Sequence, residues 1–226
     1  MSSRQEFDED LTVLLTRLTS DCDETTKNKL AVLKDWLVNL RKENIVKINH
    51  SIMELVCAKY LIEKNYDVLL EHPISEILTC DLFATKGLGN LIVEVETGFI
   101  PPENALAPLT YTSARLASKI IRYSSFAGKF ALGVPPHYIL PFPGALAKPP
   151  RNREDWEIHQ IKRLCDAYYH KPPVTFEEIR NARIHEIYII DVDHARVQEI
   201  DPEAYLKRAI QRGIVYDYLP AEVRRQ

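Results

Sequence analysis

The chain lacks the features that mark secreted and membrane proteins. Its four cysteines are widely spaced, with no Cys-x-x-Cys pair and no nearby histidine at zinc-ligand spacing. We therefore expect free thiols in a reducing compartment. No apolar run approaches the roughly 20 residues of a membrane span, and the acidic N-terminus lacks the apolar segment of a signal peptide. The sequence predicts a cytoplasmic protein with no membrane partner.

The chain also lacks a strong excess of charge of either sign. It has 29 Lys and Arg against 32 Asp and Glu, a formal net charge of -3, so any nucleic-acid-binding surface would have to be a local patch. A hydrophobic content of 46% supports a properly buried core. The length of 226 residues fits one elaborated domain, or a core with a smaller helical attachment.

What the sequence does contain is an acidic stretch typical of a β-hairpin, at residues 81–98. Two short apolar runs flank a cluster of Gly and Asn, which is a hairpin signature. If Thr85 pairs with Asn90 across a four-residue loop, Asp81 stands opposite Glu94 on one face of the hairpin. The two carboxylates are then close enough to share a ligand.

A third acid, Glu96, falls on the same face as Glu94, because alternate side chains of a strand point the same way. Carboxylates crowded into an apolar hairpin are electrostatically costly without a cation between them. The pattern therefore indicates a divalent-cation site. The alternative is a half-exposed sheet whose acids face solvent, since Glu-x-Glu is a common strand pattern.

A helix predicted at residues 51–64 adds one more acid. Its apolar stripe includes Leu55 and Ala58, and Glu54 falls beside Leu55, on or at the edge of the buried face. Glu54 is thus a candidate member of the same site. The alternative is an exposed glutamate at the boundary of the helix.

A basic stripe follows on the helix predicted at residues 109–126, which Pro108 can start because its missing N–H would be unbonded there anyway. Arg115, Lys119 and Arg122 lie at i, i+4 and i+7. Such a stripe either forms a solvated face or contacts phosphates. We keep both interpretations.

The remaining patterns predict further helices and strands. Helices are expected at residues 6–20, 27–44, 154–169, 175–182 and 202–212, and strands at residues 66–72, 129–134 and 185–192. The first two helices predict a helical hairpin with a structural or dimerising role. Residues 135–153 carry six prolines, and such a long loop is either a functional flap or a mobile linker.

The order helix, three strands, helix, strand resembles the PD-(D/E)XK nuclease superfamily over about residues 50–135. Asp81 matches the motif aspartate that starts the family's second strand, and Glu94 matches the motif glutamate of its third strand. Glu54 matches a helix glutamate of the resolvase-like and exonuclease-like branches. The stretch from Glu94 to the basic stripe also looks like archaeal and archaeal-virus members.

This resemblance implies an α/β fold with a restriction-endonuclease-like αβββαβ core and a mixed central sheet. An N-terminal helical hairpin and C-terminal α/β additions would complete it. The expected division places the helical hairpin at residues 1–45 and the nuclease-like core at 46–135. The proline-rich loop and the C-terminal extension, packed on the core, would occupy residues 136–226.

The implied function is a nuclease that depends on Mg²⁺ or Mn²⁺ and hydrolyses phosphodiester bonds of nucleic acid, DNA rather than RNA. The family pattern assigns the metal to Asp81, Glu94 and Glu54, with Glu96 as a further ligand or general base. Hard carboxylate oxygens suit those ions. Many enzymes of this fold act as dimers, so the resemblance also implies a homodimer.

The chain departs from the family in one position, because Glu96 stands where the motif has lysine. A few active restriction enzymes carry glutamate or glutamine there. Lys119 on the following helix could take the role of the lysine, and Arg115, Lys119 and Arg122 would steady phosphates. The departure also favours two alternatives: an inactive nuclease-like domain that binds nucleic acid or a protein partner, and a structural assembly protein built on the helical hairpin.

Overall fold

The computed structural model describes residues 3–42 and 48–211. The chain divides into two compact units. The first unit consists of the chain up to Thr97 together with residues 133–136 and 188–198, and the second unit contains the rest. The three parts predicted from the sequence, with boundaries at residues 45 and 135, stay a prediction.

The fold is α/β, as predicted, and within the described residues six strands form one mixed sheet in the order β1-β2-β3-β4-β5-β6. The helices are α1 (Ser3–Leu18), α2 (Glu24–Lys42), α3 (Ile48–Glu63), α4 (Pro108–Tyr123), α5 (Asp155–Asp166), α6 (Phe176–Asn181) and α7 (Pro202–Gln211). The strands are β1 (Asp67–Pro73), β2 (Thr79–Lys86), β3 (Gly89–Val95), β4 (Lys129–Val134), β5 (Glu186–Asp191) and β6 (Arg196–Ile200). None of the described helices is both long and apolar enough to cross a membrane.

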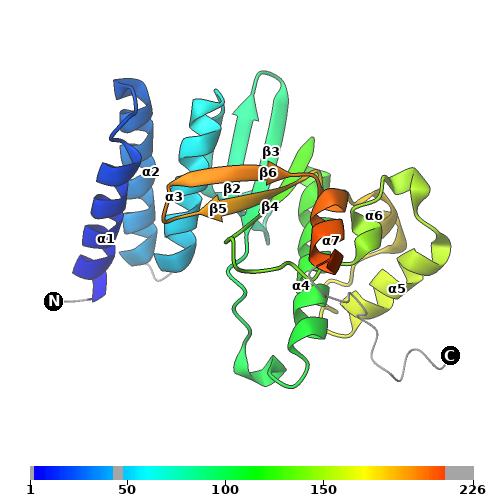
Figure 1. The fold of residues 1–226 in the computed structure, drawn as a ribbon. Coiled ribbons are helices and arrows are strands. Elements are labelled where there is room, and N and C mark those ends of the chain that lie inside the picture. The colour runs from blue at the N-terminus through cyan, green and yellow to red at the C-terminus, as the bar shows by residue number, and fades with distance from the viewer. Residues whose placement is uncertain (1–2, 43–47, 212–226) are drawn as a thin grey trace. The chain divides into compact units, whose positions relative to one another are not determined.

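In the first unit, α1, α2 and α3 lie side by side (Figure 1). The leucines of their apolar stripes are buried, among them Leu11 and Leu37. Leucine side chains spaced by three and four residues line one face of a helix, and burying that face drives the packing. At the sheet edge formed by β1, Trp36 Nε1 of α2 donates a hydrogen bond to the Leu70 carbonyl at 3.0 Å. The contact covers part of an edge strand that would otherwise expose its backbone groups.

The hairpin of β2 and β3 has the register expected from the sequence, since Thr85 pairs with Asn90. Its loop is shorter than predicted, because Lys86 also pairs with Gly89 and only residues 87–88 remain in the turn. Gly87 has φ of +59°, and a positive φ at the first central position is what a type II′ hairpin turn requires of glycine. The same turn sets the register that brings the acids together.

Helix α3 begins at Ile48, three residues before the predicted start at residue 51. Its first turn carries few apolar residues, so apolar periodicity alone did not reveal it. At its other end Asn65 adopts φ of +64°, and the Tyr66 amide donates to the Leu61 carbonyl at 3.0 Å. This left-handed asparagine cap turns the chain into β1.

The proline-rich segment, of which residues 137–153 belong to the second unit, does not form an open linker. Leu140, Phe142 and Leu146 are fully buried, and short 3-10 helices occur at Gly144–Leu146 and Pro150–Asn152. Arg153 is 5% exposed and donates hydrogen bonds to backbone carbonyls on both sides of it in the sequence. The segment is therefore an ordered part of that unit.

Candidate metal centre

Two polar side chains of the site come from neighbouring turns of α3. His50 and Glu54 are four residues apart, which places them on one face of the helix. Glu54 is 0% exposed and His50 is half-buried. The predicted placement of Glu54 on the buried face is confirmed. A fully buried carboxylate costs several kcal/mol unless nearby groups compensate it, so its surroundings decide its role.

The β2–β3 hairpin supplies the other acids. Asp81 lies one residue before the paired residues Leu82 and Val93, and this register places it opposite Glu94. The Asp81 amide donates to Glu94 Oε1 at 3.1 Å, and the Val95 amide donates to Asp81 Oδ2 at 2.5 Å. The two strands thus fix both carboxylates through backbone donors. The expectation that Asp81 and Glu94 meet across the hairpin is confirmed.

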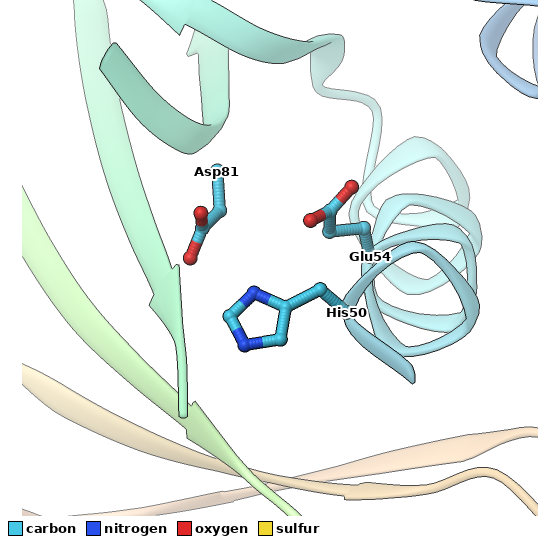
Figure 2. A group of neighbouring side chains, drawn as sticks. All are labelled: His50, Glu54 and Asp81. Carbon is cyan, nitrogen blue, oxygen red and sulfur yellow. The ribbon is translucent and has the colours of Figure 1, made fainter. Parts of the chain in front are cut away.

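His50, Glu54 and Asp81 converge between the helix and the sheet (Figure 2). One potential ligand atom from each lies within 4.8 Å of the other two. In Figure 2 the two carboxylates and the imidazole point toward a common space from α3 and β2. This is the cluster that we call the His-Glu-Asp group.

The dimensions of the His-Glu-Asp group fit a divalent ion. Ligand atoms that each lie about 2.1 Å from an octahedral ion are about 3 to 4.2 Å apart, so the group of His50, Glu54 and Asp81 needs only small side-chain shifts to bind one. Oxygen donors suit Mg²⁺ and Mn²⁺, whereas an imidazole suits first-row transition metals, and Mn²⁺ meets both descriptions. The donor set thus agrees with a divalent cation.

The sheet is locally distorted beside Asp81. The β1–β2 register includes Leu70↔Leu82 and His72↔Cys80, while Glu71, the residue between them on β1, has φ of +49°. A non-glycine residue in this region costs about 1 to 3 kcal/mol. Distortions of this kind are frequent next to functional sites, where they re-aim a side chain.

Cys80 adjoins the site but is a poor candidate for a ligand. Its burial, together with the negative charges of Glu94 and Asp81, raises the pKa of the thiol to about 12. Metals bind the thiolate, which is scarce at neutral pH when the pKa is this high. Part of this rise in the pKa of Cys80 comes from the negative charges of Glu94 and Asp81, after the larger contribution of burial.

The structure buries the remaining predicted acids. Glu94 is 1% exposed and Glu96 is 3% exposed. The Glu96 amide donates to the Gly133 carbonyl at 2.8 Å, which fixes the backbone where β3 ends. An exposed sheet face, the alternative interpretation of these acids, is therefore wrong. Their roles as ligand or base stay predictions.

The basic stripe lies on α4, in the second unit. Arg115 Nη1 donates to the Phe99 carbonyl at 2.9 Å, and Arg122 Nη2 donates to the Pro172 carbonyl at 2.5 Å. Both guanidinium groups therefore already hold neighbouring loops. Each arginine has five N–H donors, so one such bond does not preclude phosphate contact. That role, and the role of Lys119, stay predictions.

His50 is the site residue that the sequence analysis missed. The predicted helix began one residue after it, so its spacing of four from Glu54 went unused. A helix begun at residue 48 would have placed both side chains on one face. The signal was present in the sequence as a His-x-x-x-Glu pattern.

The chain shows no match to any protein-family model, curated protein or solved structure with which it was compared.

Proposed function

We propose that the protein is a divalent-metal-dependent nuclease that hydrolyses phosphodiester bonds of nucleic acid, DNA rather than RNA. The core would be restriction-endonuclease-like. The observation that carries the proposal is the convergence of His50, Glu54 and Asp81 within 4.8 Å, with Glu94 bonded to the Asp81 amide beside them. A divalent cation would stabilise such a group, because it offsets the cost of bringing negative charges together away from water.

The residues divide into those that hold the ion and those that act around it. His50, Glu54 and Asp81 would bind it directly, and Glu94 would complete the site from β3. A bound divalent ion supplies a water of lowered pKa and neutralises charge on the scissile phosphate. Glu96, which is buried directly after β3, would accept a proton from a water as a general base. The Val95 amide keeps the Asp81 carboxylate in position.

The alternative is a nuclease-like domain that binds nucleic acid or a protein partner without cleaving it. Glu96 in place of the motif lysine favours it, because a carboxylate cannot stabilise negative charge that develops on the phosphate. A domain that has lost catalysis could still retain the fold and the buried acids. Metal binding and cleavage therefore need separate tests.

The first test measures Mn²⁺ binding by isothermal titration calorimetry. We expect one site per chain that is lost in both Asp81→Asn and His50→Ala, because the first variant removes the negative charge of a ligand and the second removes a ligand atom. Asp67→Asn is the matched control, since Asp67 is an exposed acid of β1 paired with Lys29 at 2.7 Å. A wild-type chain that binds no Mn²⁺ or Mg²⁺ would contradict the proposal.

The second test measures cleavage of linear, flapped, branched and single-stranded DNA, and of RNA, with Mn²⁺ or Mg²⁺. We expect cleavage by the wild type and by Asp67→Asn. Asp81→Asn and Glu94→Gln should lower the rate at least about a hundredfold, the scale of a lost charge-stabilising group. A protein that binds Mn²⁺ at the His-Glu-Asp group but cleaves no substrate would favour the inactive alternative.

A further inference from the structure

A pocket on the β5–β6 ribbon is lined by none of the residues given a role above. These two strands are neighbours in the sheet (Figure 1). The pocket, of about 380 Å³, is lined by Pro136, Ile189, Asp191, Arg196 and Gln198. Small-ligand sites have volumes of about 300 to 1,000 Å³ and combine apolar walls with a few polar groups. The pocket meets both criteria.

Alternation along the strands brings these side chains together. Ile189 and Asp191 are two residues apart on β5, and Arg196 and Gln198 are two residues apart on β6. Each pair therefore shares one face of its strand. Pro136 follows β4 and adds a second apolar surface.

Arg196 is the cationic group in the lining of the pocket, and it lies beside one acid, Asp191. The Asp191 carboxylate accepts hydrogen bonds from Arg196 Nε at 3.2 Å and from the His194 amide at 3.2 Å. His194 Nδ1 lies 2.9 Å from Asp191 Oδ2 as well. The carboxylate is thus compensated by its own neighbours, which limits its repulsion of a ligand. The ion pair engages Nε of Arg196, so the donors on its two Nη nitrogens can serve an anion.

We propose that this pocket binds one unpaired nucleotide, with the base against Pro136 and Ile189 and the phosphate at Arg196. The choice of a nucleotide rests on the proposed function, because the pocket lies in the same unit as the His-Glu-Asp group. Gln198 provides an amide donor and acceptor for the edge of the base. Bases stack on apolar and aromatic surfaces without strong sequence preference. The pocket would hold a single-stranded end of the substrate.

The test measures binding of deoxynucleoside 5′-monophosphates to the full chain in EDTA, by calorimetry. We expect binding by the wild type, weakened about tenfold in Arg196→Ala through loss of a charge-assisted contact. Ile189→Asp should weaken it as well, because it places a negative charge on the apolar wall. Arg180→Ala is the matched control: Arg180 forms a similar exposed ion pair with Asp155, at 2.7 Å, and should leave binding unchanged.

Oligonucleotides distinguish a free nucleotide from a nucleic-acid end as the ligand. If a duplex with an unpaired overhang binds Arg196→Ala less tightly than the wild type, and a blunt duplex binds both proteins equally well, the ligand is the unpaired end of a nucleic acid. Free nucleotide bound without any overhang effect would overturn that assignment. A wild type that binds Mn²⁺ and cleaves DNA but binds no nucleotide, or equal effects of Arg196→Ala and Arg180→Ala, would overturn the inference while leaving the nuclease proposal intact.

Discussion

The two units of the chain bury charge in opposite ways. In the second unit, Arg153 is 5% exposed, and its five N–H donors meet five backbone carbonyls at 2.7 to 3.3 Å. In the first unit, Glu54 is 0% exposed, and one of its carboxylate oxygens lies within 4.8 Å of potential ligand atoms of Asp81 and His50. The Arg153 guanidinium is surrounded by carbonyl dipoles of the right sign, whereas Glu54 lies close to a second acid and a histidine.

The contrast distinguishes a charge with a structural role from a charge for which we propose a functional role. Desolvation lowers the pKa of the Arg153 guanidinium to about 10, so it remains charged at neutral pH while it joins residues 145–148 to residues 179–180. The hydrogen bonds of Arg153 compensate the free-energy cost of removing its charge from water. For the His-Glu-Asp group, a bound divalent cation, as proposed, would offset the cost of bringing two carboxylates together.

Arg153 should therefore carry the largest stability effect. We expect Arg153→Ala to lower the free energy of unfolding by about 3 to 5 kcal/mol, because several buried carbonyls lose their donor at once. Chemical denaturation measures it. Arg151→Ala, at an exposed arginine two residues away, should change stability by less than about 0.5 kcal/mol. Equal effects of the two variants would show that the carbonyl contacts of Arg153 are not what holds the segment.

Mn²⁺ should stabilise the wild type by an amount set by its affinity. At a free concentration of 100 times the dissociation constant, a ligand that binds only the folded state adds about 2.7 kcal/mol. We expect this gain in chemical denaturation of the wild type and its loss in His50→Ala. Arg153→Ala should retain the gain if its folded state persists, since Arg153 belongs to the other unit. If Mn²⁺ raises the free energy of unfolding of His50→Ala as much as that of the wild type, His50 is not a ligand of the ion.

Without metal, substitutions at Glu54 and at Glu157 should change the free energy of unfolding in opposite directions. We expect Glu54→Gln to raise the free energy of unfolding by about 1 kcal/mol, because it removes a buried negative charge beside Asp81. Glu157 is the comparison: it is 7% exposed, and its Oε1 lies 2.5 Å from Lys148 Nζ. Glu157→Gln in the same denaturation experiment should destabilise. Destabilisation by both variants would mean that Glu54 is held by favourable contacts.

The smallest effect that we expect is the contribution of His185 to the pH dependence of the free energy of unfolding. Burial, followed by the positive charges of Arg183 and Lys129, lowers the pKa of its imidazole below 6.5. The Phe130 amide donates to Nδ1 at 3.0 Å, and Glu186, the acid next to it, pairs with Lys129 at 3.4 Å. The His185 imidazole then binds a proton more tightly in the unfolded chain than in the folded chain. The contribution of neutral His185 to the free energy of unfolding is therefore present above about pH 6.5 and is lost as the pH falls through the folded-state pKa.

His185→Asn checks this sign, since asparagine keeps an acceptor but does not titrate. Lowering the pH from about 7.5 to about 5 should lower the denaturation midpoint of the wild type more than that of the variant. A difference that does not change with pH would mean that the histidine titrates alike in the folded and unfolded chains.

The sequence predicted the parts of the site that depend on strand alternation. One register, Thr85 with Asn90, was enough to place Asp81 opposite Glu94, because side chains of a strand repeat every two residues. The bounds of β4, residues 129–134, were also predicted correctly. Strong local patterns determined these elements.

The parts that failed depend on weak local signals. His50 lies in a polar first turn of α3, and β6 is a mostly exposed strand at the sheet edge, so neither has the apolar periodicity on which prediction relies. The contacts of Arg153 could not be predicted either, since they join residues that the sequence separates by up to 27 positions. Only the folded chain brings them together.

The placement of two ligand candidates on α3 and one on β2 has a mechanical consequence. An ion bound there would fasten the beginning of the helix to the strand, so amide hydrogen exchange in the first turns of α3 should slow when Mn²⁺ is added. Exchange in α5 should be unaffected. Metal binding would then reduce local opening of the chain at the proposed site.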